Sequence, residues 1–484
     1  MPKLCQNFAK TLCVAKKNPQ PTRPSGVVAV VEGMFSACLP RREPLTADNY
    51  PSGPSAPESS RPAGAFDAPH ACDASSSSLD DDGPHDRVCV IVNVRAPGAK
   101  TAVKRLKRLH DVEVLVMDSK SQERLLRRLE ELLVGSLGND ARDEDDGHGR
   151  GGRIARRIRF LAGGGDGTIA ATASLIALAC ERAGLAPELR APVAPLPLGT
   201  GNELSRICGW GALYAGAPLE RIVRDVSRAY LAKLDTWTAT ITPNETPPFG
   251  SGFDDVYDGR RDESGRKTQV RKFCCFFSVG FDAAISHRFT RRRERDPKSC
   301  STAWRNKAWY AYYGAAEFVN GGGHLLGEDG KPSVELQVDG ERIRVTRDLN
   351  SVQVFNIHSS ADGVDFWGTN RASVKGELAD DAFAPPCVGD GMLEVVGTRG
   401  VSDLVAARSG FSHSRRLAQG RRVELRTSSS VAAQMDGETW VLPPSSAVIT
   451  HAGSIPLCVG PGATRNLRPG LETSGGGGGG CLRL

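Results

Sequence analysis

Short apolar runs alternate with longer amphipathic stretches between residue 88 and the region of residue 205. The runs are rich in β-branched residues and predict buried strands, whereas the stretches repeat their apolar positions at helical spacing. The expected order is strand 88–92, helix 103–109, strand 112–117, helix 121–133, strand 158–162, helix 169–182, strand 193–198 and a helix that begins near Glu203. Strands that alternate with helices in this way predict a parallel sheet with helices on both faces.

The pattern changes after residue 234, where apolar and polar positions alternate with the period of half-buried strands. Strands are expected at 237–241, 273–279, 334–338, 352–357 and 392–396, and one helix at 305–318 interrupts them. The sequence therefore predicts an α/β fold in which a doubly wound parallel-sheet domain precedes a β-rich, sandwich-like domain. Ligands of parallel sheets bind beyond the carboxyl ends of the strands, so we expect the active site in the cleft between the domains.

Composition sets the boundaries of these domains. Residues 19–86 are rich in Pro, Ser, Gly and acidic residues and cannot bury enough apolar surface to fold, so residues 1–86 are expected to form a disordered tail. The two expected domains are residues 87–232 and residues 233–460. Residues 461–484 contain a run of glycines and are expected to form a flexible tail, and the charged stretch 140–152 is interpreted as an insertion.

Two glycine-rich turns follow strands of the first domain and open helices. The first contains Gly163, Gly164, Gly165, Gly167 and Thr168, and the second contains Gly199, Thr200, Gly201 and Asn202. Glycines let the backbone approach a phosphate closely, and the start of a helix adds a favourable dipole. The Gly-Lys-Ser/Thr ending of a P-loop is missing, so metal or other basic residues must balance the phosphate charge. Asn93 begins a third loop, which is expected at the same edge of the sheet.

Asp166 lies inside the first turn. A carboxylate there would repel the phosphates of ATP unless Mg²⁺ lay between them, or unless the acid met the incoming hydroxyl group instead. Either role is catalytic. The alternative is an aspartate that hydrogen-bonds its own glycine turn. Thr168, at the expected helix start, can cap backbone N–H groups or contact a phosphate.

Three further acidic residues are candidates for chemistry. Asp436 and Glu438 are two positions apart, so in an extended segment both carboxylates point to one face. In the cleft they would provide a general base and a partner that orients it; the alternative is a surface turn with two solvated acids. Asp390 lies in a Gly-Asp-Gly sequence and can belong to a Mg²⁺ network or to a simple β-turn.

Charge, cysteine content and the length of apolar runs indicate which ligands, which thiol state and which relation to membranes to expect. Lys and Arg outnumber Asp and Glu by 62 to 56, which gives a formal net charge of +6. Basic clusters at 288–295 and 415–422 suit anionic lipid, nucleotide or nucleic acid, although a solvated charged face explains each run as well. The 13 cysteines include no Cys-x-x-Cys pair and predict reduced thiols. No apolar run reaches the ~18–20 residues of a membrane span.

Five motifs occur in an order that resembles the catalytic and accessory regions of eukaryotic-type diacylglycerol kinases, over roughly 88–460. They are 160–168, 197–206, 279–283, 305–310 and 434–440. The resemblance implies an ATP- and Mg²⁺-dependent lipid kinase that converts diacylglycerol to phosphatidic acid. It also implies that 199–202 helps to hold the nucleotide, that Asp436 is the general base and that Glu438 is its partner.

The chain departs from that family in three respects. Glu203 stands where the family usually has Asp, and the loop after Asn93 lacks the family's usual proline and glycines. The Cys and His spacings of the zinc-bound lipid-sensing modules of many animal relatives are absent. Asn306, Lys307 and Trp309 are interpreted either as lining the cleft or as part of an amphipathic helix that packs Trp309 and Tyr313 inward.

Several functional expectations follow from the resemblance. Diacylglycerol is the expected substrate and an anionic membrane surface the expected partner, with no nucleic acid and with the oligomeric state open. Ceramide and sphingoid-base kinases share the glycine turns and are one alternative, and a catalytically weak lipid-binding or scaffold protein is another. A cytoplasmic, peripherally membrane-associated location is expected. Residues 1–31 carry no acidic residue, so an organelle transit peptide is an alternative there, and Cys481 lies in a C-a-a-X outline for lipidation.

Overall fold

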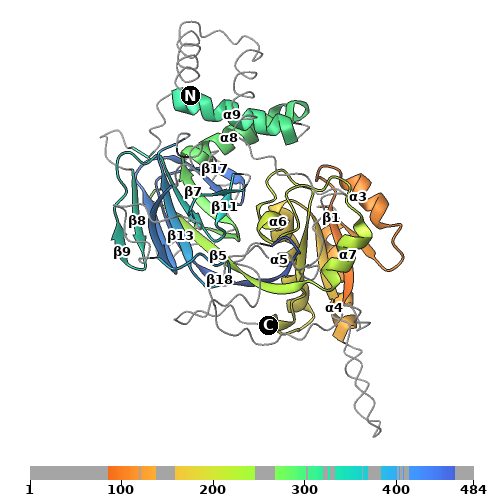
Figure 1. Cartoon of the computed structure of the whole chain (residues 1–484). Helices are drawn as coiled ribbons and strands as arrows, with labels where there is room; N and C mark the ends of the chain where they lie inside the picture. Colours follow the sequence, from red (N-terminus) through yellow and green to blue (C-terminus); the bar gives the residue numbers. More distant parts are fainter. Residues whose placement is uncertain are drawn as a thin grey trace, which may run out of the picture.

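The computed structural model of the chain describes residues 86–118, 121–137, 158–245, 268–300, 303–319, 325–326, 333–361, 363–368, 383–400, 403, 407 and 414–463. The expected N-terminal tail up to residue 85, the insertion at 140–152, Cys481 and nearly all of the expected C-terminal tail lie outside these residues. The described chain forms two units that are joined by long strands, which Figure 1 shows running between them.

The first unit is built around four parallel strands. Its elements are β1 (Arg87–Asn93), α3 (Ala99–Leu106), β2 (Glu113–Met117), α4 (Gln122–Leu137), β3 (Ile158–Gly164), α5 (Asp166–Arg182), η2 (Pro187–Leu189), β4 (Val193–Pro197), α6 (Glu203–Ile207) and α7 (Leu219–Ser227). The strands pair in the order β2-β1-β3-β4, and each pair is parallel. β1 and β3 are buried along nearly their whole length, as expected for strands that are covered on both faces. The predicted parallel α/β sheet is confirmed.

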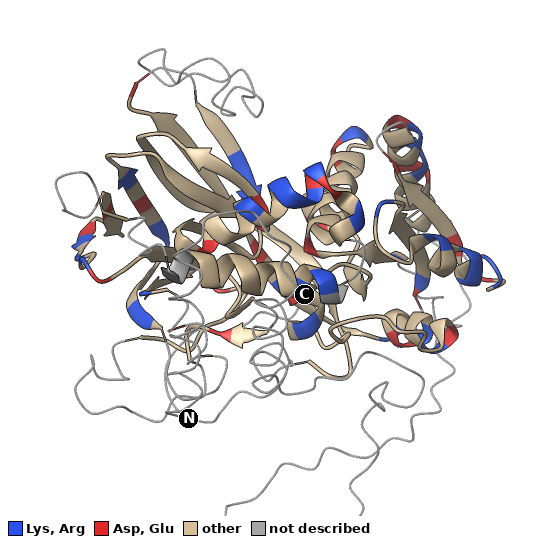
Figure 2. Ribbon diagram, turned by 90° about the horizontal axis from the view of Figure 1, so that it is seen from above, with Lys and Arg blue, Asp and Glu red and all other residues tan. Residues whose placement is uncertain are grey.

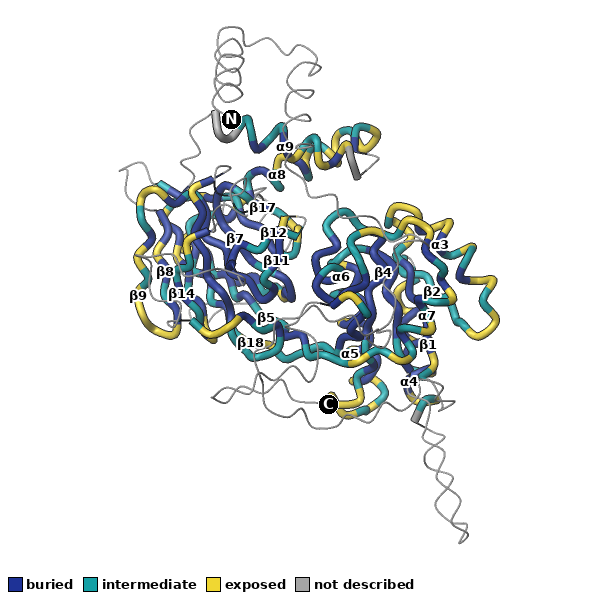
Figure 3. Tube along the Cα trace, in the orientation of Figure 1, coloured by how far each residue is buried: buried dark blue, intermediate teal, exposed yellow. Residues whose placement is uncertain are grey.

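The second unit is a sandwich of two sheets, which confirms the expected β-rich fold. Its elements are β5 (Tyr230–Pro243), β6 (Gln269–Phe273), β7 (Phe276–Gly280), α8 (Phe281–Arg295), η4 (Pro297–Cys300), α9 (Ala303–Val319), β8 (Val334–Val338), β9 (Glu341–Ile343), β10 (Ser351–Phe355), β11 (Ser359–Ser360), β12 (Val364–Asp365), β13 (Leu393–Thr398), β14 (Arg415–Gly420), β15 (Arg422–Thr427), β16 (Val431–Met435), β17 (Glu438–Leu442) and β18 (Ser445–Val459). One sheet has the order β14-β13-β10-β7-β16-β17, and β6, β5, β18, β15, β8 and β9 form the other. Trp237, Phe277, Val354 and Leu425 come from both sheets and lie in one buried cluster between them, where Figure 3 shows the second unit dark blue.

Strands β5 and β18 join the two units into one sheet. β18 pairs with β5 in antiparallel register along its whole length, and Leu457 near its end also pairs in parallel with Val193 of β4. The indole N–H of Trp210 donates to the carbonyl oxygen of Cys458 at 2.8 Å. A ten-stranded sheet therefore continues from the first unit into the second. Neither β18 nor this continuity was among the expectations from the sequence.

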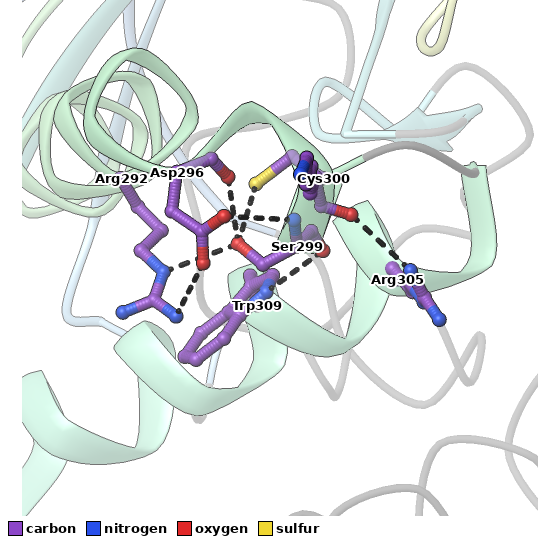
Figure 4. Close-up of polar contacts among 7 residues, drawn as sticks. Arg292, Asp296, Ser299, Cys300, Arg305 and Trp309 are labelled. Atoms are coloured by element: carbon purple, nitrogen blue, oxygen red, sulfur yellow. Dashed lines mark hydrogen bonds and ion pairs between the residues drawn. The ribbon is translucent and has the colours of Figure 1, made fainter.

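Two helices, instead of the single helix expected, lie over one end of the sandwich (Figure 1). α9 matches the expected helix, whereas α8 was missed. Phe289 of α8 stacks on Tyr310 of α9 with ring centroids 4.3 Å apart, and the Arg292 guanidinium lies 4.3 Å from the Trp309 ring centroid. Figure 4 shows the corner where the two helices meet, at which the Trp309 indole N–H donates to the Ser299 carbonyl oxygen at 3.3 Å. Packing between α8 and α9 therefore accounts for Trp309 without a ligand.

We expect Gly280→Ala to lower the free energy of unfolding by about 3 kcal/mol. Gly280 ends β7 with a φ of 111°, and a Cβ atom there would lie 2.2 Å from the Asn350 carbonyl oxygen. Gly340→Ala is the matched control, because its φ is 88° but no atom lies within 4 Å of the added Cβ. That control should cost only about 1 kcal/mol. Urea denaturation measures both losses, and equal losses would show that the contact with Asn350 is unimportant.

Candidate active site

The two glycine turns of the first unit pack directly against each other. The backbone N–H groups of Leu198 and Gly199 both donate to the Gly164 carbonyl oxygen, at 3.0 and 3.2 Å. A Cβ atom on Gly199 would lie 2.5 Å from the Cα atom of Gly165. A side chain at Gly199 would therefore push the turns apart, so glycine is required there for backbone contact rather than for flexibility.

Asp166 connects the first turn to the helix that follows the second. Its carboxylate accepts the backbone N–H groups of Glu203 at 3.0 Å and Leu204 at 2.9 Å, which are the first residues of α6. Burial raises the pKa of Asp166, and these two amide hydrogen bonds oppose the rise. Asp166 therefore bonds the start of α6 in addition to its own backbone N–H group. The expected helix start near Ile169 is wrong, because α5 begins at Asp166.

Asn202 gives the second turn its shape. It has a φ of 54°, in the left-handed region that asparagine tolerates. Its side-chain oxygen accepts the Gly199 N–H at 3.0 Å, and its side-chain NH₂ donates to the carbonyl oxygens of Gly199 at 2.9 Å and Ala212 at 2.8 Å. The residue is 1% exposed. The amide thus holds the turn in its shape.

Asn93 and Thr168 link the third loop to the first. The Asn93 side-chain NH₂ donates to the Thr168 hydroxyl oxygen at 3.1 Å, and the Asn93 side-chain oxygen accepts the Arg95 N–H at 3.0 Å. Thr168 is buried, and the N-terminus of α5 has Gly165 as its cap without a side-chain hydrogen bond. Thr168 therefore does not cap the helix. The three loops after β1, β3 and β4 lie at one edge of the sheet, as predicted.

Glu203 connects the first unit to the second. The side chain is buried. Its carboxylate accepts the Ser359 hydroxyl group at 2.7 Å, and it also accepts the Gly363 N–H group, whose nitrogen lies 3.1 and 3.2 Å from the two carboxylate oxygens. Ser359 begins β11 in the second unit. The residue that departs from the family pattern therefore makes contacts between the units, a role that the sequence did not indicate.

Asp436 occupies a tight hairpin turn rather than an extended segment. Its φ is 47° and that of Gly437 is 85°, and Met435 pairs with Glu438 across the turn between β16 and β17. Two successive left-handed residues between paired strands form a type I′ turn, for which Asp-Gly is a favoured sequence. The expectation that both carboxylates point to one face of an extended strand is therefore wrong.

The two carboxylates of this hairpin have different surroundings. Asp436 accepts three backbone N–H groups, those of Cys274 at 2.9 Å, Cys275 at 2.9 Å and Phe276 at 3.0 Å. Burial raises the pKa of Asp436 to about 6, against the lowering effect of these amides. The Glu438 side chain is 84% exposed and lies 3.6 Å from the Arg271 guanidinium. Asp436 is thus tied to the protein, whereas Glu438 extends into solvent.

Asp436 contacts a pair of buried cysteines, Cys274 and Cys275, and the charge of Asp166 also acts on this pair. The pKa of the Cys275 thiol is raised well above its ordinary value, by its hydrogen bond with Cys274, by burial and by the charges of Asp436 and Asp166. The buried cysteine pair beside Asp436 was not predicted.

Asp390 bonds its own turn. It accepts the Met392 N–H at 2.9 Å, and burial raises its pKa, as does the nearby charge of Asp235. Asp235 is fully buried and accepts the Gly391 N–H at 2.6 Å, with the His451 Nε2 atom at 3.0 Å from its other oxygen. Within the described part of the chain, Asp390 belongs to no group of three or more side chains that could share a metal ion. The geometry supports the β-turn interpretation.

Asp282, in the 279–283 motif, binds the strand that leads into the hairpin turn. Its carboxylate accepts the Ser278 hydroxyl at 2.6 Å and the Gln434 side-chain NH₂ at 2.6 Å, and it also accepts the Ser351 hydroxyl. These partners lie on β7, β10 and β16. Because Gln434 is two residues before Asp436, Asp282 holds the strand that ends in the turn. The motif thus has a structural role that its apolar pattern did not reveal.

We expect the stability of the protein to depend on pH through Asp436. Its pKa is higher in the folded state, about 6, than its ordinary value of 3.8, so its contribution is fully present below pH 3.8 and is lost as pH rises through about 6. The difference corresponds to about 2–3 kcal/mol. Urea denaturation between pH 4 and 7 should show this decline in the wild type and a flatter profile in Asp436→Asn. Glu438→Gln, at an exposed position, should keep the wild-type profile; a wild-type slope in Asp436→Asn would contradict the assignment.

Comparisons with known proteins agree with this arrangement. The sequence model of the diacylglycerol kinase catalytic domain matches residues 87–233, and that of the diacylglycerol kinase accessory domain matches residues 272–439. Diacylglycerol kinase 2 of Arabidopsis thaliana is 32% identical over 302 residues, which is 62% of this chain and 38% of the relative. Diacylglycerol kinase theta of Homo sapiens is 31% identical over 301 residues, 61% of this chain and 29% of the relative. The chain therefore matches well under half the length of these relatives.

A crystal structure of a diacylglycerol kinase from Bacillus anthracis str. Sterne covers 78% of this chain and 99% of its own, with 12% identity and a TM-score of 0.40. The two domain models match the chain in order. The catalytic-domain model matches the unit that carries the glycine turns, and the accessory-domain model matches the part of the second unit that includes the hairpin turn. The chain therefore belongs to the diacylglycerol kinase family, of which it carries the catalytic and the accessory domain.

Proposed function

We propose that this chain is a lipid kinase that transfers the terminal phosphoryl group of ATP to the hydroxyl group of 1,2-diacylglycerol and forms phosphatidic acid. The observation that carries the proposal is the position of Asp166, which lies between two stacked glycine turns and binds the start of α6. The presence of both family domains and the names of the relatives support the same substrate.

The glycines of the two turns differ in a way that suits a bound triphosphate. Gly199 is in contact with backbone. Among the described residues, by contrast, no atom lies within 4 Å of a Cβ placed on Gly167, and only the Asp166 Oδ2 atom, at 3.6 Å, lies near one on Gly201. The side of the turns that holds Gly167 and Gly201 is therefore open. A phosphate that approaches there meets the backbone and the N-terminus of α5, with a dipole that favours negative charge.

The Asp166 carboxylate fits a divalent cation. Each of its oxygens accepts one backbone N–H group, and a carboxylate has about four lone-pair sites. Lone pairs therefore remain on both oxygens for Mg²⁺, which commonly uses one or two carboxylates together with substrate phosphates. When bound, Mg²⁺ neutralises the charge of the phosphates. The α6 amides hold the carboxylate in place beforehand.

The hairpin supplies the candidate general base. Asp436 was the first choice from the resemblance, but its carboxylate receives three N–H groups and the Cys274 thiol at 3.5 Å. Those four donors use about all the lone-pair sites of a carboxylate, so little capacity remains to accept a substrate proton. Glu438, on the other end of the turn, is exposed. We therefore assign the base role to Glu438 and a positioning role to Asp436.

The substrate assignment has a direct experiment. The full chain is incubated with radiolabelled ATP and, separately, with diacylglycerol, ceramide or sphingosine in mixed micelles. Labelled phosphatidic acid as the main product supports the proposal, whereas preferential labelling of ceramide or sphingosine supports the alternative kinase. Absence of transfer to all three lipids would favour a catalytically weak scaffold protein.

Asp166→Asn should lower kcat by at least ~100-fold, a loss of about 2.7 kcal/mol of transition-state stabilisation. The substitution keeps the size of the side chain but removes the charge that faces the phosphates. The thermal unfolding midpoint is measured in parallel, because Asp166 also binds the start of α6. A variant that folds and retains more than about a tenth of the wild-type kcat would restrict Asp166 to a structural role.

Asp436→Asn and Glu438→Gln should have additive effects on the activation free energy, because the two side chains have separate partners. Glu438→Gln should lower kcat without changing the unfolding midpoint, whereas Asp436→Asn should also lower the midpoint. Single-turnover rates of both single variants and the double variant measure the coupling. If either single variant is as slow as the double variant, the residues act as one unit and the separation is incorrect.

The exposed face of α8 is the candidate membrane contact. Arg288, Arg291, Arg293 and Arg295 are exposed on this helix, and Figure 2 marks Lys and Arg in blue. In the second basic cluster, by contrast, Arg416 donates to the carbonyl oxygens of Trp367 and Gly368 at 2.8 Å, so part of it serves packing. None of the helices among the described residues combines the length and apolar character that a membrane crossing needs.

We expect binding of the full chain to vesicles to weaken as salt rises and as anionic lipid is removed, because screening limits surface charges to ~8 Å at physiological salt. The double variant Arg291→Gln with Arg295→Gln should bind several-fold more weakly than the wild type in sedimentation with anionic vesicles. Arg415→Gln, in the other cluster, is the control. Equal binding by all three proteins would exclude α8 as the contact.

A further inference from the structure

Cys274 and Cys275 lie at the corner where the chain passes from β6 in one sheet to β7 in the other sheet of the sandwich. Both residues are 1% exposed. Their sulfur atoms are 3.9 Å apart, and the Cys274 sulfur is 3.5 Å from the Asp436 Oδ2 atom. Among the described residues, these three side chains are the group whose donor atoms all lie within 4.8 Å of one another.

These distances match the edges of a zinc coordination tetrahedron. With Zn–S bonds of about 2.3 Å and Zn–O bonds of about 2.0–2.2 Å, a regular tetrahedron has S···S edges of about 3.8 Å and S···O edges of about 3.6 Å. The observed separations of 3.9 and 3.5 Å match two of the three edges, and the third, between the Cys275 sulfur and the Asp436 carboxylate, is within 4.8 Å. Two sulfur donors and one oxygen donor also select a thiophilic ion over Mg²⁺ or Ca²⁺, which prefer oxygen ligands.

We propose that Cys274, Cys275 and Asp436 form a binding site for a thiophilic divalent cation of the Zn²⁺ class. Each cysteine binds through sulfur after releasing its proton to solvent, and Asp436 binds through Oδ2. Three protein ligands leave the fourth position of the tetrahedron to a water molecule. No electron transfer is involved, so the only exchange is two protons for one cation.

The hairpin can keep its conformation when the cation binds. The other carboxylate oxygen of Asp436, Oδ1, accepts the N–H groups of Cys275 and Phe276, at 2.9 and 3.0 Å. Those bonds hold the carboxylate, while Oδ2 keeps the Cys274 N–H at 2.9 Å and gives the cation the lone pair that the Cys274 thiol releases when it loses its proton. A bound ion would thus connect the corner between the sheets to the turn between β16 and β17. Because an ion that binds only the folded state stabilises it, the site acts as a metal clip.

The first experiment compares the full-length wild type with the double variant Cys274→Ser with Cys275→Ser. Both proteins are treated with a chelator, kept reduced with a phosphine and titrated with Cd²⁺, whose bonds to thiolates give an ultraviolet charge-transfer band. The wild type should bind one more equivalent of Cd²⁺ than the variant, with a larger band, and only its unfolding midpoint should rise by several degrees. Cys180→Ser removes a buried cysteine of α5 and is the matched control; it should behave like the wild type.

A second measurement needs no variant and remains decisive if the double variant does not fold. The wild type is alkylated with iodoacetamide with and without Zn²⁺, and the modified peptides are quantified by mass spectrometry. Zn²⁺ should slow the modification of Cys274 and Cys275 several-fold more than that of Cys180, which is also buried and reports the stabilisation of the fold alone. Equal Cd²⁺ binding by wild type and double variant, or alkylation of Cys274 and Cys275 that is indifferent to Zn²⁺, overturns the site. None of these readouts depends on kinase activity.

Discussion

The contact between the Asp166 carboxylate and the first amides of α6 fixes the geometry on which the rest of the candidate site depends. It connects the first glycine turn to the helix after the second turn, and the packing of Gly165 on Gly199 leaves no room for either turn to shift. Glu203, whose N–H group donates to Asp166, then uses its side chain to bind Ser359 in the second unit. A single chain of hydrogen bonds therefore runs from the first glycine turn into the second unit.

This arrangement explains which features the sequence could reveal. The four parallel strands and the glycine turns carry local signals, namely continuous apolar runs and a residue type that permits backbone contact. Their order along the chain was enough to place the three loops at one edge of the sheet. Resemblance to the family added the residues of the second unit, such as Asp436, whose role no local pattern could give. The exchange of Asp for Glu203 was visible, but its consequence depends on Ser359, far away in the sequence.

The predictions that were wrong or missing also have physical reasons. The segment from Asp436 to Glu438 was interpreted with the period of a strand, although Asp-Gly between two apolar runs is also the signal of a type I′ hairpin. α8 was missed because five arginines in its second half hide its apolar face, which includes Phe281, Ile285 and Phe289. β18 has a normal strand pattern in its first half, but the pairing with β5 and β4 joins positions more than 200 residues apart. Periodicity within a short window contains no information on such pairs.

The shared strands also limit how the proposed kinase can work. Because β5 and β18 run from the first unit into the second as paired strands, a hinge between the units would have to break or bend their hydrogen-bond ladder. The register shift of β18 between His451 and Gly453 is the point at which bending costs least, since a bulge already interrupts the pairing there. Elsewhere the ladder holds β5, which pairs with β6, and the amides that follow β6 bind Asp436 in the hairpin turn. Under the proposed function, catalysis then depends mainly on carboxylates that are already in place before the substrates bind, as expected for a reaction whose main demands are positioning and charge neutralisation.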